Sequence, residues 1–385
     1  MKVLVAHNRY RSALPSGENA VVEDDISALR SAGVEVLPLI ADSDSIPGLG
    51  IGGKLGVASG PIFNPAGVAR MQRMLSVHRP DVVHVHNVFP LLSPWILRAA
   101  HSAGVPVVQT IHNFRQDCVA GTYFRRGTVC TDCVGHRLAT PALRHGCYRD
   151  SRVQSLPMVL GRSAHKSTWR LVERFLVLTP FHARWLGAQG VPEGRIVVRP
   201  TSVPDPGSSR RPGRDVLFAG RLDAEKGIEL LLDAWALRNP DGRRLLIAGD
   251  GPLSANIRAR SEGDPSITFI GPLAPAQVAV AMESAGVIAV PSLWLEGLPR
   301  VAVEAMAHGR ALLAANQGGL GAVVDSSCGW LVEPSVQAWA EALSAIDDKA
   351  LVQRGAGART AFLHRFERTV STRQLLETYS DVIAP

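Results

Sequence analysis

The sequence predicts an α/β protein made of two doubly wound domains, each with a mostly parallel sheet. The chain has 385 residues, more than a single hydrophobic core usually supports. Short apolar runs alternate with helical segments throughout, a pattern typical of parallel strands joined by crossover helices. One stretch, TSVPDPGSSRRPGR, is rich in Pro, Gly, Ser and Arg and shows no periodicity. We therefore expect the domain boundary there.

The predicted strands form two sets, one for each domain. The first set is KVLVAH, VEVLPLI, VVHVHN, PVVQTIH, RFLVLT and IVVRP. The second set is DVLFAG, RRLLIAG, ITFIG, VIAVPS, ALLAAN and GWLVE. The expected organisation is a first domain at 1–200 with a Cys-rich, basic insertion at about 113–169, a linker at 201–214, a second domain at 215–364, and an amphipathic helix at 365–385.

Composition narrows the class of protein. Hydrophobic residues make up 46% and charged residues 19%, which is typical of a globular chain. The formal charge of +7 suggests an anionic partner such as a sugar nucleotide, a lipid pyrophosphate or a membrane surface. Aromatic residues are only 5% and no recognition motif is present, so a nucleic-acid partner is not expected. No apolar run reaches membrane-spanning length and the start resembles a strand more than a signal peptide. We therefore expect a cytoplasmic protein, with peripheral contact with the inner face of the plasma membrane left open.

The stretch PSLWLEGLPRVAVEAMAHG carries two glutamates, Glu296 and Glu304, with seven residues between them. The apolar run before it predicts a buried strand, so Glu296 should lie on the loop at the strand's carboxyl end and Glu304 in the next helix. Pro299 suits the first helical position, and the turn that includes Gly297 and Leu298 directs free N–H groups at a ligand. Such a helix start suits a phosphate with hydroxyl groups on either side. The alternative is a solvated loop Glu and an ordinary helix Glu.

Two cations follow the first strand of the second domain, in GRLDAEKG. Arg221 and Lys226 would stabilise the charge that develops on a departing diphosphate. The alternative is that they form surface pairs with Asp223 and Glu225.

Two short turns carry glycines. The turn GDGP, which includes Asp250 and Gly251, follows the strand RLLIAG, and its glycines would let the backbone approach a ligand closely. The alternative, and the more common case for such a pattern alone, is an ordinary turn. Near the start of the chain, Gly17 opens a helix after the first strand. The neighbouring Glu18 or Asn19 could contact an acceptor, or the segment could be a plain helix start.

Histidines end two strands of the first domain. His112 lies at the carboxyl end of its strand, where the ligand crevice of an open sheet forms, although a structural histidine is an alternative. In VVHVHN we expect His84 in the core and consider His86 a residue that could face a ligand.

Taken in order, GRLDAEKG, GDGP and the paired glutamates resemble the signature of retaining glycosyltransferases of family 4, which have the GT-B fold. The resemblance covers nearly the whole chain. It implies two Rossmann-like domains that face a central cleft, with the C-terminal helix crossing back to the first domain. It also implies closure on donor binding and transfer of a sugar from a nucleotide sugar with retention at the anomeric carbon.

The resemblance also implies roles for individual residues. His112 would lie near the donor sugar, although this chain has His112-Asn113 where the family usually has His-Asp. Gly17 corresponds by position to a loop that approaches the diphosphate. The remaining implied roles are diphosphate binding by Arg221 and Lys226, donor-sugar contact by Glu296 with the turn Gly297, Leu298 and Pro299, ribose binding by Glu304, and nucleoside contact by Asp250 and Gly251.

The expected function is transfer to a glycan, lipid-linked or small-molecule acceptor, as the N-terminal half resembles enzymes of bacterial surface-polysaccharide synthesis. With Arg221 and Lys226 carrying the phosphate charge, no catalytic metal is required. The Asp42-Ser43-Asp44 stretch spells the metal-binding motif of another glycosyltransferase fold, but we expect an ordinary loop there. The alternatives are a nucleotide-sugar epimerase of the same fold and a non-catalytic nucleotide-sugar-binding subunit of a polysaccharide assembly complex.

The insertion at about 113–169 contains four of the five cysteines. Cys118, Cys130, Cys133 and Cys147 could close a structural zinc site, or they could be unconnected thiols. The lone Cys328 is expected in the core. Eight cations lie between residues 137 and 174: Arg137, Arg144, Arg149, Arg152, Arg162, Lys166, Arg170 and Arg174. They could face an acceptor phosphate or anionic lipid, or each could be part of an ordinary solvated basic face.

Overall fold

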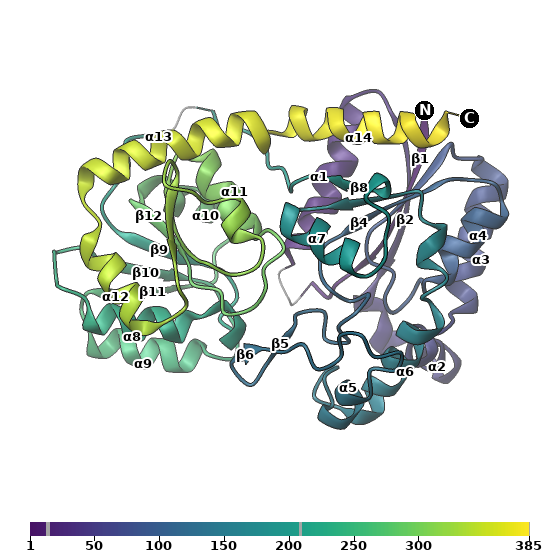
Figure 1. The fold of residues 1–385 in the computed structure, drawn as a ribbon, viewed down its shortest axis with the longest axis horizontal. Helices are drawn as coiled ribbons and strands as arrows, with labels where there is room; N and C mark the ends of the chain where they lie inside the picture. Colours follow the sequence, from purple (N-terminus) through teal and green to yellow (C-terminus); the bar gives the residue numbers. More distant parts are fainter. Residues whose placement is uncertain (13–15, 208–209, 385) are drawn as a thin grey trace. The chain divides into compact units, whose positions relative to one another are not determined.

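The computed structural model describes residues 1–12, 16–207 and 210–384. Two compact units are present. The first contains Met1–Tyr123, Cys130–Arg199 and the chain from Thr372 onward, and the second contains Phe124–Val129 and Pro200–Ser371. Within these ranges each unit contains one six-stranded parallel sheet (Figure 1). The predicted doubly wound α/β architecture is confirmed.

Every predicted strand is present in one of the two sheets. The first sheet has the order β2-β1-β3-β4-β7-β8 and the second β11-β10-β9-β12-β13-β14. The strands are β1 (Lys2–Arg9), β2 (Glu35–Asp42), β3 (Val82–Val85), β4 (Val107–Ile111), β7 (Arg174–Val177), β8 (Ile196–Val198), β9 (Val216–Ala219), β10 (Leu245–Ala248), β11 (Ile267–Gly271), β12 (Val287–Val290), β13 (Ala311–Ala315) and β14 (Gly329–Val332).

Both sheets reverse their winding direction once. In the first sheet the chain moves outward from β1 to β2 and then resumes on the other side of β1 with β3. In the second sheet the same reversal lies between β9 and β12. Parallel strands leave a crevice outside their carboxyl ends at such a switch point, and ligands bind there in open α/β sheets. The loops after these strands are therefore the places to look for a site.

Helices connect the strands. Those of the first unit are α1 (Gly17–Ser31), α2 (Ile51–Ser59), α3 (Pro65–His78), α4 (Trp95–Ser102), α5 (Thr140–His145), α6 (Arg152–Ala164) and α7 (Pro180–Ala188). The second unit has α8 (Ile228–Leu237), α9 (Ser254–Gly263), α10 (Pro275–Ser284), α11 (Arg300–Ala307), α12 (Val336–Ala345) and α13 (Asp348–Arg365), and α14 (Arg368–Ile383) follows. Short 3₁₀ turns are η1 (Ser43–Gly48), η2 (Trp169–Leu171), η3 (Glu193–Arg195), η4 (Ala224–Lys226) and η5 (Leu320–Ala322).

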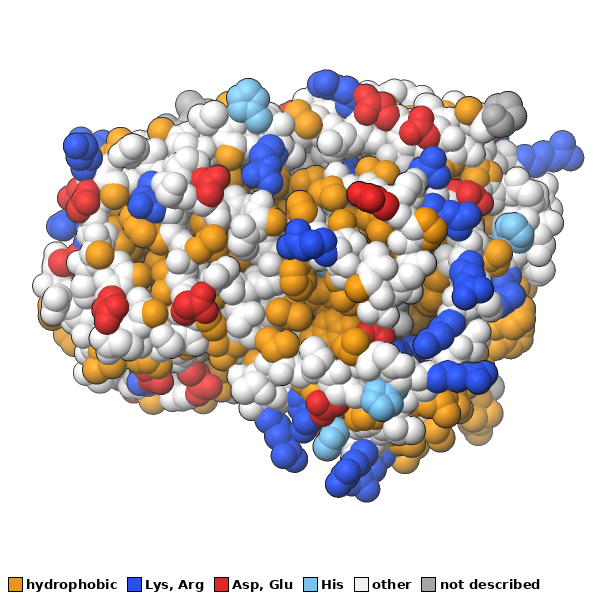
Figure 2. Space-filling view, viewed as in Figure 1, with side chains coloured by type: hydrophobic (Ala, Val, Ile, Leu, Met, Phe, Trp, Pro, Cys, Tyr) orange, Lys and Arg blue, Asp and Glu red, His pale blue; other side chains and the backbone are white. Residues whose placement is uncertain are grey.

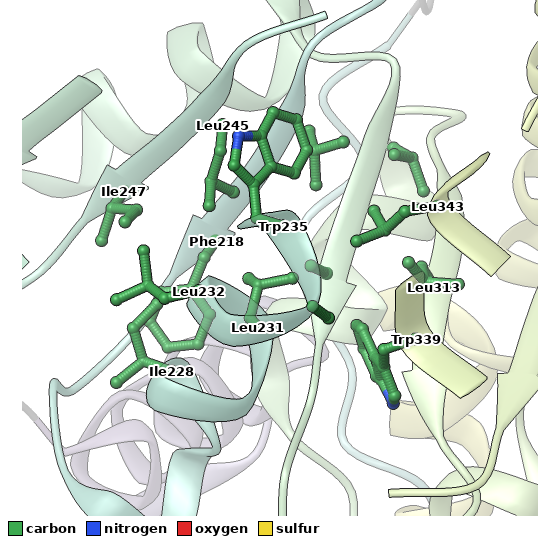
Figure 3. Packing of buried hydrophobic residues seen from close by; sticks show 14 of the residues in the cluster. Phe218, Ile228, Leu231, Leu232, Trp235, Leu245, Ile247, Leu313, Trp339 and Leu343 are labelled. Atoms are coloured by element: carbon green, nitrogen blue, oxygen red, sulfur yellow. The ribbon is translucent and has the colours of Figure 1, made fainter. Parts of the chain in front are cut away.

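The core of the second unit packs two tryptophans between helices and the sheet (Figure 3). Trp235 of α8 and Trp339 of α12 are almost fully buried, beside Phe218 of β9 and Leu313 of β13. Burying a large aromatic side chain removes much apolar area from water, so these residues anchor the helices to the sheet. As expected, Cys328 is buried.

Both ends of the predicted interdomain linker pack against the second unit, although a linker requires no such contacts. Thr201, Ser202 and Val203 are buried parts of the second unit, and the N–H of Gly213 donates to the carbonyl of Ala285 over 3.1 Å. Positions 208 and 209 of the predicted linker, and position 385 of the predicted last helix, lie outside the described residues.

The C-terminal region is two helices and not one. Helix α13 ends at Arg365, where Phe366 is fully buried, and α14 begins at Arg368. From Thr372 onward α14 belongs to the first unit, where Leu375 and Tyr379 pack among side chains of β1, β3 and α1. The predicted return of the C-terminal helix to the first domain is confirmed.

The Cys-rich insertion contains a two-stranded hairpin that the sequence pattern did not indicate, β5 (Phe124–Arg125) and β6 (Thr128–Val129). Among its predicted surface cations Arg162 is an exception, because it is buried and pairs with the carboxylate of Asp117. Arg162 therefore serves the interior of the insertion and cannot face a lipid headgroup. No helix in the described ranges is long and apolar enough to cross a membrane.

A buried ion pair joins α1 to the end of the first sheet. The guanidinium of Arg199, which follows β8, reaches both carboxylate oxygens of Asp25 over 2.6 and 3.0 Å, and both side chains are 4% exposed. Burial alone would raise the pKa of Asp25, but the neighbouring guanidinium outweighs it and holds this pKa below its ordinary value.

Replacing Arg199 by Leu should lower the free energy of unfolding of the first unit by about 3–5 kcal/mol, because it leaves a buried carboxylate unpaired. Urea unfolding would measure this loss. The matched control is Arg184→Leu, since Arg184 is exposed on α7. Because the pKa of Asp25 is lowered in the folded state, the pair's stabilisation should persist above about pH 4 and fade as the pH falls below it. A native-like stability for Arg199→Leu at pH 7 would contradict this role.

Candidate active site

The two strongest candidates from the sequence meet in the second unit. The ammonium of Lys226 lies 2.7 Å from Oε1 of Glu296, and the hydroxyl of Ser292 donates to the same oxygen over 2.7 Å. Within the described residues, Oε2 of Glu296 takes part in no hydrogen bond or ion pair. Glu296 is buried, whereas Lys226 is partly exposed. The carboxylate is therefore neutralised and fixed on one oxygen, and its second oxygen is available to a ligand.

Strand order explains why residues 70 positions apart in the sequence meet. Lys226 follows β9 and Glu296 follows β12, and these strands are parallel neighbours at the switch point. The two loops touch directly, since the N–H of Leu293 donates to the carbonyl of Glu225 over 2.9 Å. Gly227 has a φ of +70°, and a Cβ there would lie 1.9 Å from the carbonyl oxygen of Pro291. Only glycine permits this approach without moving the backbone.

Glu304 lies on α11, in the helix that follows Glu296, as predicted. Its Oε1 accepts from Nε of Arg300 over 2.7 Å, and its side chain is 29% exposed. Pro299 is the N-cap and not the first helical residue, a shift of one position from the prediction. No side chain caps this end of α11, and the N–H of Ala302 donates to the carbonyl of Pro299 over 3.0 Å. An uncapped helix start is a position that favours an anion. Gly297 and Leu298 are buried in the turn just before the helix.

Arg221 is already paired with two carboxylates, so its side chain is less available to a diphosphate than the predicted role requires. Its guanidinium pairs with Asp223 over 2.5 Å and with Glu225 over 2.7 Å, both on its own loop. This was the alternative considered from the sequence. Arg221 is 39% exposed, so a diphosphate could still reach it by displacing these carboxylates.

The GDGP turn packs against the loop that carries the two cations. A Cβ on Gly251 would lie 2.7 Å from the carbonyl oxygen of Leu222, and one on Gly249 would lie 1.9 Å from that of Gly220. These glycines therefore allow a close approach of neighbouring backbone, and contact of this turn with a ligand stays a prediction. Asp250 is exposed and accepts from the N–H of Gly251 and the hydroxyl of Ser254, which lowers its pKa.

Two neighbours of Glu296 were missed by sequence reasoning. Trp294 places its ring 4.8 Å from Nζ of Lys226, a cation–π contact. Gly318 has a φ of +58°, and a Cβ there would lie 2.5 Å from the carbonyl oxygen of Glu296. The next residue, Gly319, donates its N–H to that carbonyl over 2.6 Å. The Gly-Gly pair in NQGGLG was a visible signal, but its partner is 22 residues away in the sequence.

In the first unit, His112 follows β4 and contacts His86 at the end of β3. Nε2 of His112 lies 2.9 Å from Nδ1 of His86. Burial lowers the pKa of His112 to about 3 and that of His86 well below its ordinary range, so both rings are neutral. His84 is a core residue, as expected, bonded to Thr110 and to the hydroxyl of Tyr379.

The start of α1 lies beside these histidines. Asn19 serves the fold, because its Oδ1 accepts from Nε2 of His7 and from the N–H of Tyr10. Gly17 is exposed in the first turn, after the N-cap Ser16. Glu18 lines a small cavity of about 20 Å³ with His86, His112 and Arg115. Burial raises the pKa of Glu18 to about 7, despite the nearby Arg115.

The remaining candidates do not assemble into a site. Among the described residues no group of three or more His, Cys, Asp or Glu side chains is arranged to hold a metal ion. Cys118, Cys130, Cys133 and Cys147 are thiols, and burial raises the pKa of Cys133 to about 11. The Asp42-Ser43-Asp44 stretch ends β2 and begins η1, where Asp42 accepts from the N–H of Asp44 and Asp44 accepts from the N–H of Ser12.

Comparisons with known proteins agree with this layout. A "Glycosyl transferase 4-like domain" model matches residues 16–201, and a "Glycosyl transferases group 1" model matches residues 213–348. A phosphatidyl-myo-inositol mannosyltransferase of Mycobacterium leprae is 28% identical over 334 residues, covering 83% of this chain and 78% of that protein. A D-inositol 3-phosphate glycosyltransferase of Corynebacterium glutamicum is 34% identical over 184 residues, which is 44% of each chain.

Solved structures share the fold. HepE of Anabaena, solved in complex with UDP and glucose, has a TM-score of 0.69 at 17% identity and covers 99% of this chain and 100% of its own. Sucrose-phosphate synthase of Thermosynechococcus elongatus has a TM-score of 0.73 at 20% identity, with 100% and 99% covered. At these identities the likeness concerns the fold. Since the two family models match both halves in order, the chain belongs to the family 4 type of glycosyltransferases and has the GT-B fold.

Proposed function

We propose that this enzyme transfers a sugar from a nucleoside diphosphate sugar, with retention at the anomeric carbon, to a glycan, lipid-linked or small-molecule acceptor. The observation that carries the proposal is the contact of Lys226 with Glu296 at the switch point of the second sheet, beside the uncapped start of α11. This places a cation, the start of a helix without a side-chain cap and a carboxylate oxygen together. The names of the relatives, which act on inositol lipids and inositol phosphates, support an acceptor rich in hydroxyl groups.

Each group then has a role that suits its chemistry. Lys226 and the α11 amides hold the diphosphate, joined by Arg221 once the carboxylates of its loop are displaced. Oε2 of Glu296 accepts from a donor-sugar hydroxyl, and Glu304 accepts from the ribose diol. Asp250 and Gly251 lie on the nucleoside side.

The reaction proceeds on one face of the sugar. The bond from the anomeric carbon to the diphosphate breaks, the acceptor oxygen bonds to that carbon on the same face, and its proton passes to the departing phosphate. Cations of the protein stabilise the negative charge that develops on the phosphate, so the proposal requires no metal ion.

His112 acts in this proposal as a hydrogen-bond donor. If His112 donated to His86, the proton of His86 would lie on Nε2, which is buried without a partner. An orphaned buried N–H costs about 1–3 kcal/mol. The favoured arrangement is therefore donation from Nδ1 of His86 to Nε2 of His112. This leaves His112 protonated on Nδ1, a neutral donor for a sugar oxygen.

Calorimetry of the full chain against UDP, GDP and ADP tests the proposal, and UDP comes first because HepE binds it. One nucleotide should bind, and Glu304→Ala should weaken it by about tenfold or more because the ribose diol loses its acceptor. The control is Glu262→Ala, an exposed glutamate on α9. Absence of binding, or equal loss in both variants, would refute the assignment. Incubation of the protein with the nucleotide sugar alone separates the alternative, because formation of an isomerised nucleotide sugar without acceptor would indicate an epimerase.

Gly318→Ala should lower kcat by about 10- to 100-fold, because the new Cβ displaces the backbone of Glu296. Steady-state kinetics with the identified donor would show it. Gly242→Ala is a matched control, since Gly242 has a φ of +80° but no atom within 4 Å of a Cβ. Both variants carry the strain of a positive φ, so a loss shared by both would remove Glu296 from the explanation.

Glu18 should impose a pH dependence on acceptor use, if its carboxylate accepts from an acceptor hydroxyl. Because burial raises its pKa to about 7, the carboxylate form disappears below that pH. Acceptor kcat/KM should then fall by up to about tenfold per pH unit below pH 7 and level off above it. Glu18→Gln should lose this inflection, whereas Glu23→Gln, on the same helix, should keep it. An unchanged profile in Glu18→Gln would exclude Glu18.

A further inference from the structure

A groove of about 580 Å³ lies between β14, the last strand of the second sheet, and helix α12. This volume falls within the range of about 300–1,000 Å³ that is usual for ligand pockets. Its floor contains Trp330 and Val332 of β14 and the small side chains Ala338, Ala342 and Ala345, which recur along one face of α12. Small side chains on the helix leave room for another backbone between helix and strand. None of the described residues that line the groove is a candidate of the active site.

Strand β14 lies at the edge of the second sheet and, within the described part of the chain, pairs with β13 alone. The carbonyl of Val332 accepts from the N–H of Asn316 over 2.8 Å, so the backbone groups of Val332 face β13. Backbone groups of successive strand residues point to opposite sides, so the N–H and carbonyl of Leu331 point to the open edge. Such an edge is a template on which a further strand can form.

The open part of this edge is short, because the carbonyls on either side of Leu331 already have partners. The carbonyl of Gly329 accepts from the guanidinium of Arg354, and that of Glu333 accepts within the turn that follows β14. One residue of a partner can still exchange two hydrogen bonds with Leu331, as in the hydrogen-bonded pairs of an antiparallel ladder.

The groove is acidic, although the whole chain carries a formal charge of +7. The segment 311–348, which includes β14 and α12, contains no Lys, Arg or His. Three carboxylates line the groove, those of Asp325, Glu333 and Glu341, and all three residues are exposed. Figure 2 shows red and orange side chains together at the lower left, where α12 lies in Figure 1.

Two cations of α13 approach the groove, and both already have partners. Arg354, which lines the groove, donates to the carbonyl of Gly329 and lies with its guanidinium carbon 4.1 Å from the ring centroid of Trp330. Arg365 donates to the carbonyl of Ala322 over 3.2 Å. Three lining carboxylates therefore face one lining guanidinium, and this excess of negative charge favours a basic partner.

We propose that an extended, basic segment of a partner protein binds in this groove by adding a strand to β14. Its backbone bonds to Leu331, its alternate side chains lie against the small residues of α12, and its Lys or Arg side chains reach the carboxylates at the rim. A peptide is favoured over a small cation because the groove offers an open strand edge in addition to its charge. The inference does not depend on the proposed function, since the groove shares no residue with the candidate active site.

Fluorescence anisotropy of labelled peptides with the full chain tests the docking. The probe is a heptapeptide of alternating Lys and Val, because β-branched residues favour an extended backbone. It should bind, whereas a heptapeptide of alternating Glu and Val should bind more weakly by about tenfold or more. The Lys-Val peptide with methylated backbone nitrogens should show a similar loss, because it has no N–H to donate to β14.

Two variants locate the binding site. Glu333→Gln with Glu341→Gln should weaken binding of the Lys-Val peptide by about three- to tenfold and reduce its dependence on salt. Ala342→Phe, which fills the groove, should abolish binding. Thermal unfolding would show whether Ala342→Phe is folded, and the double variant, at two exposed positions, tests the same site without altering packing.

Matched controls lie on other helices of the second unit. Glu229→Gln with Glu262→Gln removes two exposed carboxylates from α8 and α9, and Ala259→Phe enlarges an exposed alanine of α9. These variants should bind the peptide as the unaltered chain does. Absence of Lys-Val binding, equal binding of the methylated peptide, or an equal loss in the controls would overturn the proposal. Self-association of the chain that is lost in the groove variants, without peptide binding, would also overturn it and assign the groove to a second copy.

Discussion

The ion pair between Lys226 and Glu296 depends on the order of strands in the second sheet. Because β9 and β12 are parallel neighbours, their carboxyl ends lie side by side at the same edge of the sheet. The loops that follow these strands must therefore lie next to each other. Leaving Glu296 buried without a partner would cost several kcal/mol, so the cation stabilises the fold in addition to its proposed role in binding a ligand. The same contact fixes one carboxylate oxygen and leaves the other available. Structure and proposed chemistry therefore share a single constraint.

The sequence predicted what depends on local pattern. The twelve strands of the two sheets follow from apolar runs alternating with helices, and the placement of Glu296 on a loop and Glu304 on a helix follows from the strand before them. The sequence did not predict contacts between residues that are distant in the chain and meet only in the folded structure. Gly318 has no side chain where the backbone of Glu296 approaches, and the ring of His86 is hydrogen-bonded to the ring of His112. Neither partner is visible in the local sequence.

Contacts inside the protein account for residues that local reasoning assigned to a ligand or to the surface. Gly249 and Gly251 lack side chains where the carbonyl groups of Gly220 and Leu222 approach, and the ligand-facing role of their turn stays a prediction. A glycine indicates that something approaches the backbone, but not whether it is ligand or protein. Arg162 belonged to a basic run and was expected to face outward. Its charge instead compensates Asp117 in the interior of the insertion.

The histidines at the switch point of the first unit are neutral, and this suits the proposed reaction. The second unit offers cations and carboxylates, which a diphosphate and a ribose require. In the first unit, burial keeps His7, His84, His86 and His112 neutral, with the pKa of His112 lowered to about 3. Positive charge develops on the sugar ring as the bond to the diphosphate breaks. A protonated His112 beside that ring would oppose this charge, whereas a neutral donor held by His86 can bind a sugar oxygen without doing so.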